Sequence, residues 1–296
     1  MENRDCFAVV GIRPPAPPPP EGRAPWYKGR PVLAWIVLGI LVFGCLFAEF
    51  FLSGDPGYMD FLHAAQPPGR EFWFGTDTLG RDIFSMIWVG GRTSLAVGFA
   101  AAALSAALGL ALGALGAMAP GGVERALNRL VEIFLSVPHL LVVTLLLGVL
   151  GNAGAGTLAL TLGLTSWTDI AKVVGTEARR LRASGYVTAS RAMGGGFFHI
   201  LRRHLTPGCF SSMMFMAVMN VRNAIAAEAS LSFLGLGLPL EAVSWGNMLA
   251  MAQQALLGGY WWMIVIPGGF LAAALLCLTE IGNSLRRGRG GRHSYL

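Results

Sequence analysis

Long runs without a charged residue are the feature that most limits the folds open to this chain of 296 residues. A helix needs about 20 mostly apolar residues to cross about 30 Å of hydrocarbon, because it rises about 1.5 Å per residue. Hydrophobic residues make up 54% of the chain and charged residues only 13%, a balance far from that of a soluble domain. The sequence therefore predicts an all-α integral membrane protein.

Six membrane crossings are expected from these runs. The run at 133–168 is uncharged but too long for one crossing, and the glycine-rich stretch at 151–156 divides it into two helices joined by a tight turn. Pro138 and Pro267 lie inside expected crossings and predict kinks. The other four crossings are expected at 31–48, 93–123, 205–221 and 261–279.

The positions of the basic residues predict the orientation. Most of the 22 Lys and Arg residues fall in segments that share one side of the membrane if the N-terminus is cytoplasmic. Because short cytoplasmic loops are enriched in Lys and Arg, both termini are expected inside the cell. The net charge of +6 then requires no nucleic-acid partner. The proline-rich residues 1–30 are expected to form an extended cytoplasmic tail, and residues 286–296 a basic one.

The polar segment before the fifth expected crossing contains a glycine break. Residues 186–193 can form two helical turns, and residues 197–205 can be helical again. The glycines at 194–196 break the helix, because glycine tolerates positive φ and is a poor helix former. A short helix of small residues can dock in a groove of another protein. The alternative is an amphipathic segment on the lipid headgroups, with Arg202 and Arg203 facing anionic lipid, and the residues alone favour neither.

Three blocks resemble the C-type permease subunits of the dipeptide, oligopeptide and nickel ABC importers. The first is Phe74-Gly-Thr-Asp-Thr-Leu-Gly-Arg-Asp-Ile-Phe-Ser85 with Gly91-Arg-Thr-Ser-Leu95, similar to the segment before their second span. The second, Tyr186-Val-Thr-Ala-Ser-Arg-Ala-Met-Gly194, resembles their EAA loop, whose short helix docks on the ATPase subunit. The third is Glu228-Ala-Ser-Leu-Ser-Phe-Leu-Gly-Leu-Gly237 with Ser244-Trp-Gly-Asn-Met248. The blocks occur in the family's order, and the resemblance covers roughly residues 31–285.

The resemblance implies a MetI-like, six-transmembrane-helix type I ABC importer permease of the bacterial inner membrane, with both termini inside. The expected parts are the tail 1–30, a first helix and external segment at 31–92, a permease core at 93–285 that contains the coupling loop 173–205, and the tail 286–296. Thr188-Ala189-Ser190 replaces the usual Glu-Ala-Ala of the loop. The ATPase-docking residues implied by the resemblance are Tyr186, Thr188, Ala189, Ser190, Arg191, Ala192, Gly194, Ile200, His204 and Pro207.

The chain is not expected to be an enzyme, because a phosphate-binding loop needs Gly-Lys followed by Ser or Thr. Neither Lys28 nor Lys172 is followed by such a residue. No catalytic, cofactor or metal site is predicted in this chain, and ATP and Mg²⁺ would be bound by one or two separate P-loop ATPase subunits. The resemblance further implies a homologous B-type permease as the other half of the pore, an external solute-binding protein and surrounding lipid, with no nucleic acid.

Charged or helix-breaking residues inside expected crossings are candidates for the pore. Intramembrane charge is by default a functional hypothesis, so Arg222 and Glu228, together with Pro138, are candidate pore or gating residues. Gly109 and Gly113 form a GxxxG pair that predicts close helix packing, with a neighbour either in this chain or in a partner.

Three classes of function are compared. The expected one is import of peptides or similar small solutes by an ABC importer, with a nickel or metal-chelate importer as the alternative cargo class. A secondary transporter would need no ATPase and would be expected to show internal repeats. A membrane enzyme would need an assembled nucleophile, base or metal cluster.

Overall fold

The computed structural model describes residues 31–51, 57–119, 121–151, 154–182, 184–194 and 206–290. These residues are mostly helical, as expected. The β-type pairing found among them is an isolated antiparallel bridge between Thr76 and Asp82. The helices are α1 (Val32–Leu46), α2 (Ala48–Phe51), η1 (Phe61–His63), α3 (Ile83–Met118), α4 (Gly121–Ser136), α5 (His139–Leu150), α6 (Ala155–Thr165), α7 (Trp167–Arg182), α8 (Gly185–Ala192), α10 (Thr206–Phe233), α11 (Trp245–Ala255), η3 (Leu256–Gly258) and α12 (Trp262–Gly290).

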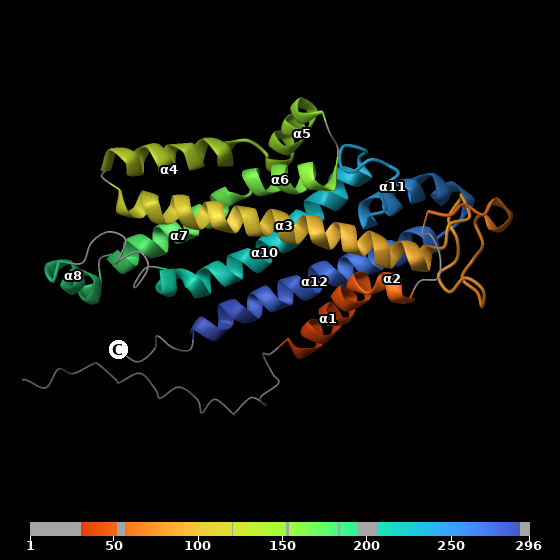
Figure 1. Cartoon of the computed structure of the whole chain (residues 1–296), viewed down its shortest axis with the longest axis horizontal. Helices are drawn as coiled ribbons and strands as arrows, with labels where there is room; N and C mark the ends of the chain where they lie inside the picture. The colour runs from red at the N-terminus through yellow and green to blue at the C-terminus, as the bar shows by residue number, and fades with distance from the viewer. Residues whose placement is uncertain are drawn as a thin grey trace, which may run out of the picture. The chain divides into compact units, whose positions relative to one another are not determined.

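The long helix α3 lies at the centre of the packing, against α7, α10, α6 and α1 (Figure 1). A first apolar core joins α1, α3, α10, α11 and α12 around the fully buried Ile87, Ile225 and Trp245. A second core joins α3, α5, α6 and α10 around Val143 and Leu158. The fold is thus a helix bundle organised around a single helix.

Helix α3 begins ten residues before the expected crossing at 93–123. Asp82 caps it, because its carboxylate accepts hydrogen bonds from the backbone N–H groups of Phe84 and Ser85, at 3.2 and 3.0 Å. The Ser85 hydroxyl donates to the same carboxylate at 2.6 Å. Such a cap satisfies N–H groups that have no partner within the helix. The hydrophobic run therefore located the middle of this helix but missed its start.

The region expected to form two crossings at 133–168 is divided differently. It contains the end of α4, all of α5 and α6, and the first residues of α7. Helices α4 and α5 meet at an angle of 91° around Val137 and Pro138, so the break predicted at Pro138 is confirmed. Proline ends a helix here because it lacks an N–H donor and its ring clashes with the preceding turn. Pro267, in contrast, lies inside α12, which continues through it.

The described residues establish fewer crossings than the six expected. Two helical stretches, Ile83–Ala117 and Trp262–Arg286, are long and apolar enough to cross a membrane. The bent pair α4 and α5 makes a third if it is one span, and α1 is apolar but only 15 residues long. Helix α10 has 28 residues, but its polar side chains lower its hydropathy. These side chains include Asn220, Arg222, Asn223 and Glu228.

Helix α10 also extends well beyond the apolar run at 205–221. It continues to Phe233 and ends where Gly235 adopts a left-handed φ of 73°. The Leu236 N–H then donates to the carbonyl of Leu231 at 2.8 Å, a hydrogen bond typical of a helix end closed by glycine. Helix α11 follows from Trp245, with Ser244 as its cap.

The glycine pair of α3 packs against α7 of the same chain. A Cβ atom on Gly109 would lie 2.6 Å from Cβ of Ile170, and one on Gly113 would lie 2.6 Å from the carbonyl oxygen of Ala171. Both distances are too short for any side chain, so the two helices can approach this closely only at glycine. The close packing predicted from the GxxxG spacing is confirmed, and its neighbour lies within this chain.

Candidate functional site

Helix α8 carries part of the candidate docking segment and is anchored to the bundle through Val187. Val187 is fully buried and packs with Ala117 of α3 and Ala178 of α7. Figure 1 shows α8 near one end of α3 and residues 57–82 near the other. The segment is therefore attached to the two helices that pack together at Gly109 and Gly113.

The predicted break after α8 is present. Helix α8 ends at Ala192, and Gly194 adopts a φ of 85°, which residues with a side chain rarely adopt. Met193 is 82% exposed, whereas Ser190 is buried. Tyr186, Thr188, Ala189 and Arg191 lie on α8, and Pro207 lies in the first turn of α10. Ile200, His204 and the second helix expected at 197–205 lie outside the described residues.

The first sequence block folds into a tight turn before α3 that is held by a buried ion pair. Arg81 Nε donates to Asp77 Oδ2 at 2.7 Å, and the backbone N–H groups of Arg81 and Leu79 donate to Asp77 Oδ1 at 2.8 and 2.9 Å. Gly80 has a φ of 78°, and a Cβ atom there would lie 1.8 Å from the carbonyl oxygen of Asp60. The turn therefore requires glycine at this position.

This turn is tied both to α12 and to the segment before it. Trp262 Nε1 donates to the Thr76 carbonyl oxygen at 3.2 Å, and the Thr76 hydroxyl donates to the His63 carbonyl oxygen at 2.5 Å. His63 Nδ1 is 2.7 Å from Asp60 Oδ2. This hydrogen bond raises the pKa of His63 and lowers the pKa of Asp60 from their ordinary values.

The first and third sequence blocks meet at Trp245. This side chain is fully buried, and its Nε1 donates to the Ile87 carbonyl oxygen at 3.0 Å. Its backbone N–H donates to Ser94 Oγ at 3.3 Å, and a Cβ atom on Gly91 would lie 2.6 Å from its ring. Residues more than 140 positions apart in the sequence thus form one junction between α3 and α11.

Glu228 lies inside this junction and not on a surface. Its side chain is fully buried, and Oε1 accepts a hydrogen bond from the Ser232 hydroxyl at 3.0 Å. The hydroxyls of Ser94 and Ser244 are also close enough to interact with the carboxyl group. Oε2 has no hydrogen-bond partner of normal geometry among the residues that the structure describes. Glu228 therefore joins α10 to the beginning of α11 and to α3.

Arg222 and Pro138 have different surroundings. Arg222 is half-buried, and its Nη2 donates to Asn223 Oδ1 at 2.5 Å. Pro138 precedes α5 at the bend, where the neighbouring His139 is fixed by Thr165 of α6, with 2.9 Å between Nε2 and Oγ1. His139 therefore links the start of α5 to α6. The structure does not bring Arg222, Glu228 and Pro138 together into one site.

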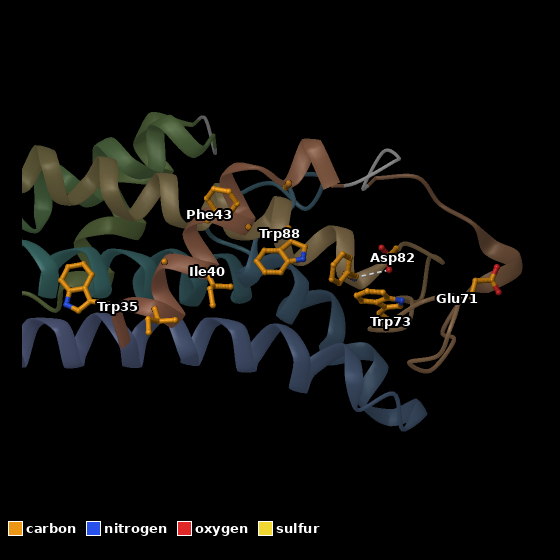
Figure 2. Close-up of a pocket in the computed structure, with 12 residues that line it drawn as sticks. Trp35, Ile40, Phe43, Glu71, Trp73, Asp82 and Trp88 are labelled. Carbon is orange, nitrogen blue, oxygen red and sulfur yellow. Dashed lines mark hydrogen bonds between the residues drawn. The ribbon is translucent and has the colours of Figure 1, made fainter. Parts of the chain in front are cut away.

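An apolar groove of about 820 Å³ runs along α1 and the start of α3. Figure 2 shows Trp35, Ile40, Phe43 and Trp88 along it, with Glu71, Trp73 and Asp82 at the end formed by the segment before α3. The groove contains none of the candidate docking or pore residues. Its apolar lining suits the hydrocarbon region of a bilayer.

Comparison with known proteins relates the chain to transport systems. The family of binding-protein-dependent transport system inner membrane components matches residues 105–283. The oligopeptide transport system permease protein OppC of Bacillus subtilis (strain 168) is 34% identical over 251 residues, which are 85% of this chain and 82% of that protein. The dipeptide transport system permease protein DppC of the same organism is 34% identical over 74% of this chain and 68% of that protein. A putative peptide permease protein of Brucella suis biovar 1 (strain 1330) is 35% identical over 86% and 84%.

Among solved structures, the fold is similar to a chain of the MetNI methionine ABC transporter in an inward-facing conformation. The TM-score is 0.58, with 20% sequence identity, and the similarity covers 69% of this chain and 95% of that one. At this identity the likeness concerns the fold alone. It agrees with the MetI-like helical architecture expected from the sequence.

Proposed function

We propose that this chain forms half of a translocation pore for peptides or similar small solutes, because it belongs to the family of binding-protein-dependent transport system inner membrane components. It is a permease component of an ABC importer. Peptide cargo is preferred to nickel or a metal chelate because the relatives compared above are named as oligopeptide, dipeptide or peptide permeases. A homologous B-type permease would form the other half of the pore.

The energy would come from one or two separate P-loop ATPase subunits that bind ATP and Mg²⁺. An external solute-binding protein would deliver the cargo to a six-helix permease in the bacterial inner membrane. In this arrangement α8 and its exposed turn face the cytoplasm, and residues 57–82 face the binding protein. Closure of the ATPase subunits would move α8 and shift the helices between inward- and outward-open arrangements.

One observation carries this coupling role, namely that Val187 joins α8 to α3 and α7 while the turn that follows is exposed. The three helices share a core cluster. Helices α3 and α7 cannot separate at Gly109 and Gly113 without losing the close backbone contacts there. A displacement of α8 would therefore be passed to α3, whose other end lies at the junction around Trp245.

Substitution of Gly194 tests this proposal. At a φ of 85°, leucine is strained, so Gly194→Leu is expected to change the shape of the turn while leaving membrane insertion unaffected. Peptide uptake by the complete importer should fall about tenfold or more, whereas ATP hydrolysis continues. Gly122→Leu is the matched control, because Gly122 is an exposed helical glycine with no atom near its Cβ position.

Unchanged uptake by Gly194→Leu at normal expression would count against the coupling role. Uptake by the purified chain without any ATPase would instead support the secondary-transporter alternative.

A further inference from the structure

One face of α10 carries polar side chains that are not used for packing within the described part of the chain. Arg222, Ala226, Ser230 and Phe233 follow at three- and four-residue spacing, so they lie on one face of the helix. Val221, Ile225 and Glu228 belong to the buried side. Asn223 and Ser230 are exposed, and Arg222 is half-buried. The described part of the chain therefore leaves these polar side chains uncovered.

Lipid is a poor neighbour for this face. Arg222 lies about 4 Å from the midpoint of the 28-residue helix at 1.5 Å per residue, and the hydrocarbon layer extends about 15 Å to each side of its centre. A centrally placed arginine is costly in hydrocarbon, and such residues usually face a protein interior or a water-filled cavity. The Arg222 face is thus suited to the aqueous pathway of the pore.

The guanidinium group of Arg222 has unused hydrogen-bonding capacity. Nη2 donates to the neutral side chain of Asn223, whereas the buried Nε has no partner among the described residues. No ion pair joins Arg222 to a carboxylate in this part of the chain. A guanidinium group in this state is complementary to a carboxylate, which it can bind through two parallel N–H donors.

An apolar groove of about 440 Å³ begins one helical turn from Arg222. It lies between α10, α11 and α12, and its lining includes Ala226, Ser230, Phe233, Leu249, Leu271 and Leu275. A cation one helical turn from an apolar groove is complementary to a ligand with a carboxylate near an apolar side chain. A peptide with an apolar last residue has this chemistry.

We propose that Arg222 and this groove form a subsite for the C-terminal carboxylate and the last side chain of a peptide cargo during its passage. Arg222 would bind the carboxylate, and Leu249, Leu271 and Leu275 would contact the side chain. The inference rests on the proposed function, since it requires that peptides pass through this permease.

The test uses the complete importer in proteoliposomes, with its solute-binding protein and a labelled dipeptide ending in phenylalanine. For Arg222→Gln, kcat/KM of uptake is expected to fall about 10- to 100-fold, the range for loss of a charged hydrogen-bonded contact. Arg222→Lys keeps the charge but loses the paired N–H donors, so its kcat/KM should lie between those of the wild type and Arg222→Gln. Arg125→Gln, which removes an exposed charge on α4, is the control and should stay within about twofold.

The C-terminal amide of the same dipeptide separates a carboxylate contact from a structural effect. With the solute-binding protein saturated, Arg222→Gln should change uptake of the amide less than about twofold. The subsite would be disproved by unchanged uptake of the acid in Arg222→Gln, by equal losses for acid and amide, or by an Arg222→Lys variant as poor as Arg222→Gln. Failure of the wild-type importer to transport any peptide would overturn the proposed function itself.

Discussion

The shape of the turn before α3 depends on the backbone at Gly80. A Cβ atom would lie 1.8 Å from the carbonyl oxygen of Asp60, and the φ of 78° is unfavourable for any residue with a side chain. Gly80→Ala is therefore expected to destabilise the protein by about 2 kcal/mol or more, since neither backbone segment can move without breaking the turn. Thermal unfolding in detergent, with the yield of folded protein, would measure the effect.

Gly69→Ala is the matched control for this substitution. Gly69 lies in the same segment at 57–82, and the atom nearest to a new Cβ there, the Pro67 carbonyl oxygen, would be 3.7 Å away, an ordinary contact. Its melting temperature should remain close to that of the wild type. Equal melting temperatures for the two variants would show that the turn is not rigid.

The buried carboxyl group of Glu228 provides a second prediction at this scale. Glu228→Gln keeps the shape of the side chain and an oxygen that accepts from Ser232, so it should be tolerated. Glu228→Leu leaves the hydroxyl groups of Ser94, Ser232 and Ser244 without this partner, at a cost of about 1–3 kcal/mol. The difference in melting temperature between the two variants is the measurement. A leucine variant as stable as the glutamine variant would contradict the junction role.

The residues that build the junction were only partly predictable. The sequence blocks around Gly91 and Trp245 were identified by resemblance, yet nothing in their spacing showed that they touch. The Asp82 cap was missed, although an aspartate directly before an apolar run is a recognisable start of a helix. Intramembrane charge drew attention to Glu228, but the burial that makes it a packing element depends on tertiary contacts.

Among the helices, the pair α3 and α7 offers a direct test of close packing. Gly113→Ala would place a Cβ atom 2.6 Å from the backbone oxygen of Ala171, so the helices must separate, at an expected cost of about 1–3 kcal/mol. Gly148→Ala on α5 is the control, because no atom lies within 4 Å of its Cβ position and alanine is the better helix former. Thermal unfolding of both variants should give a clear loss only at Gly113, and equal stability would contradict the packing.

Helix boundaries were the least predictable feature at this scale. Hydropathy located α1 to within two residues at each end and also the start of α12, but it missed the start of α3, which the Asp82 cap sets, and the continuation of α12 beyond residue 279. The uncharged run at 133–168 wrongly predicted two membrane crossings, because α5 and α6 are short helices and α4 is amphipathic. Pro138 correctly predicted the break between α4 and α5. Polar residues in α10 hid its continuation to Phe233. Their partners come from the folded chain, since Asn220 donates to Ser105 of α3 and Ser232 donates to Glu228 one turn away.

Over the molecule as a whole, the expected inward orientation of the termini is the prediction with the widest consequences. It places Met193 in the cytoplasm and Tyr58 outside, and these side chains are 82% and 70% exposed. In a variant whose native cysteines are replaced, Tyr58→Cys should react with a membrane-impermeant thiol reagent in spheroplasts, whereas Met193→Cys should not. Inverted vesicles should give the opposite pattern, because the same two positions then face the other solution.

The same pair of variants also discriminates the coupling role from its alternatives. If α8 docks on an ATPase, the thiol reagent should label Met193→Cys more slowly when the ATPase is present, since a docked partner covers the turn. Labelling of Met193→Cys from outside intact spheroplasts would put α8 on the wrong side of the membrane for any cytoplasmic ATPase. In that case neither ATP-driven movement of α3 nor the delivery of peptide to residues 57–82 could operate as proposed.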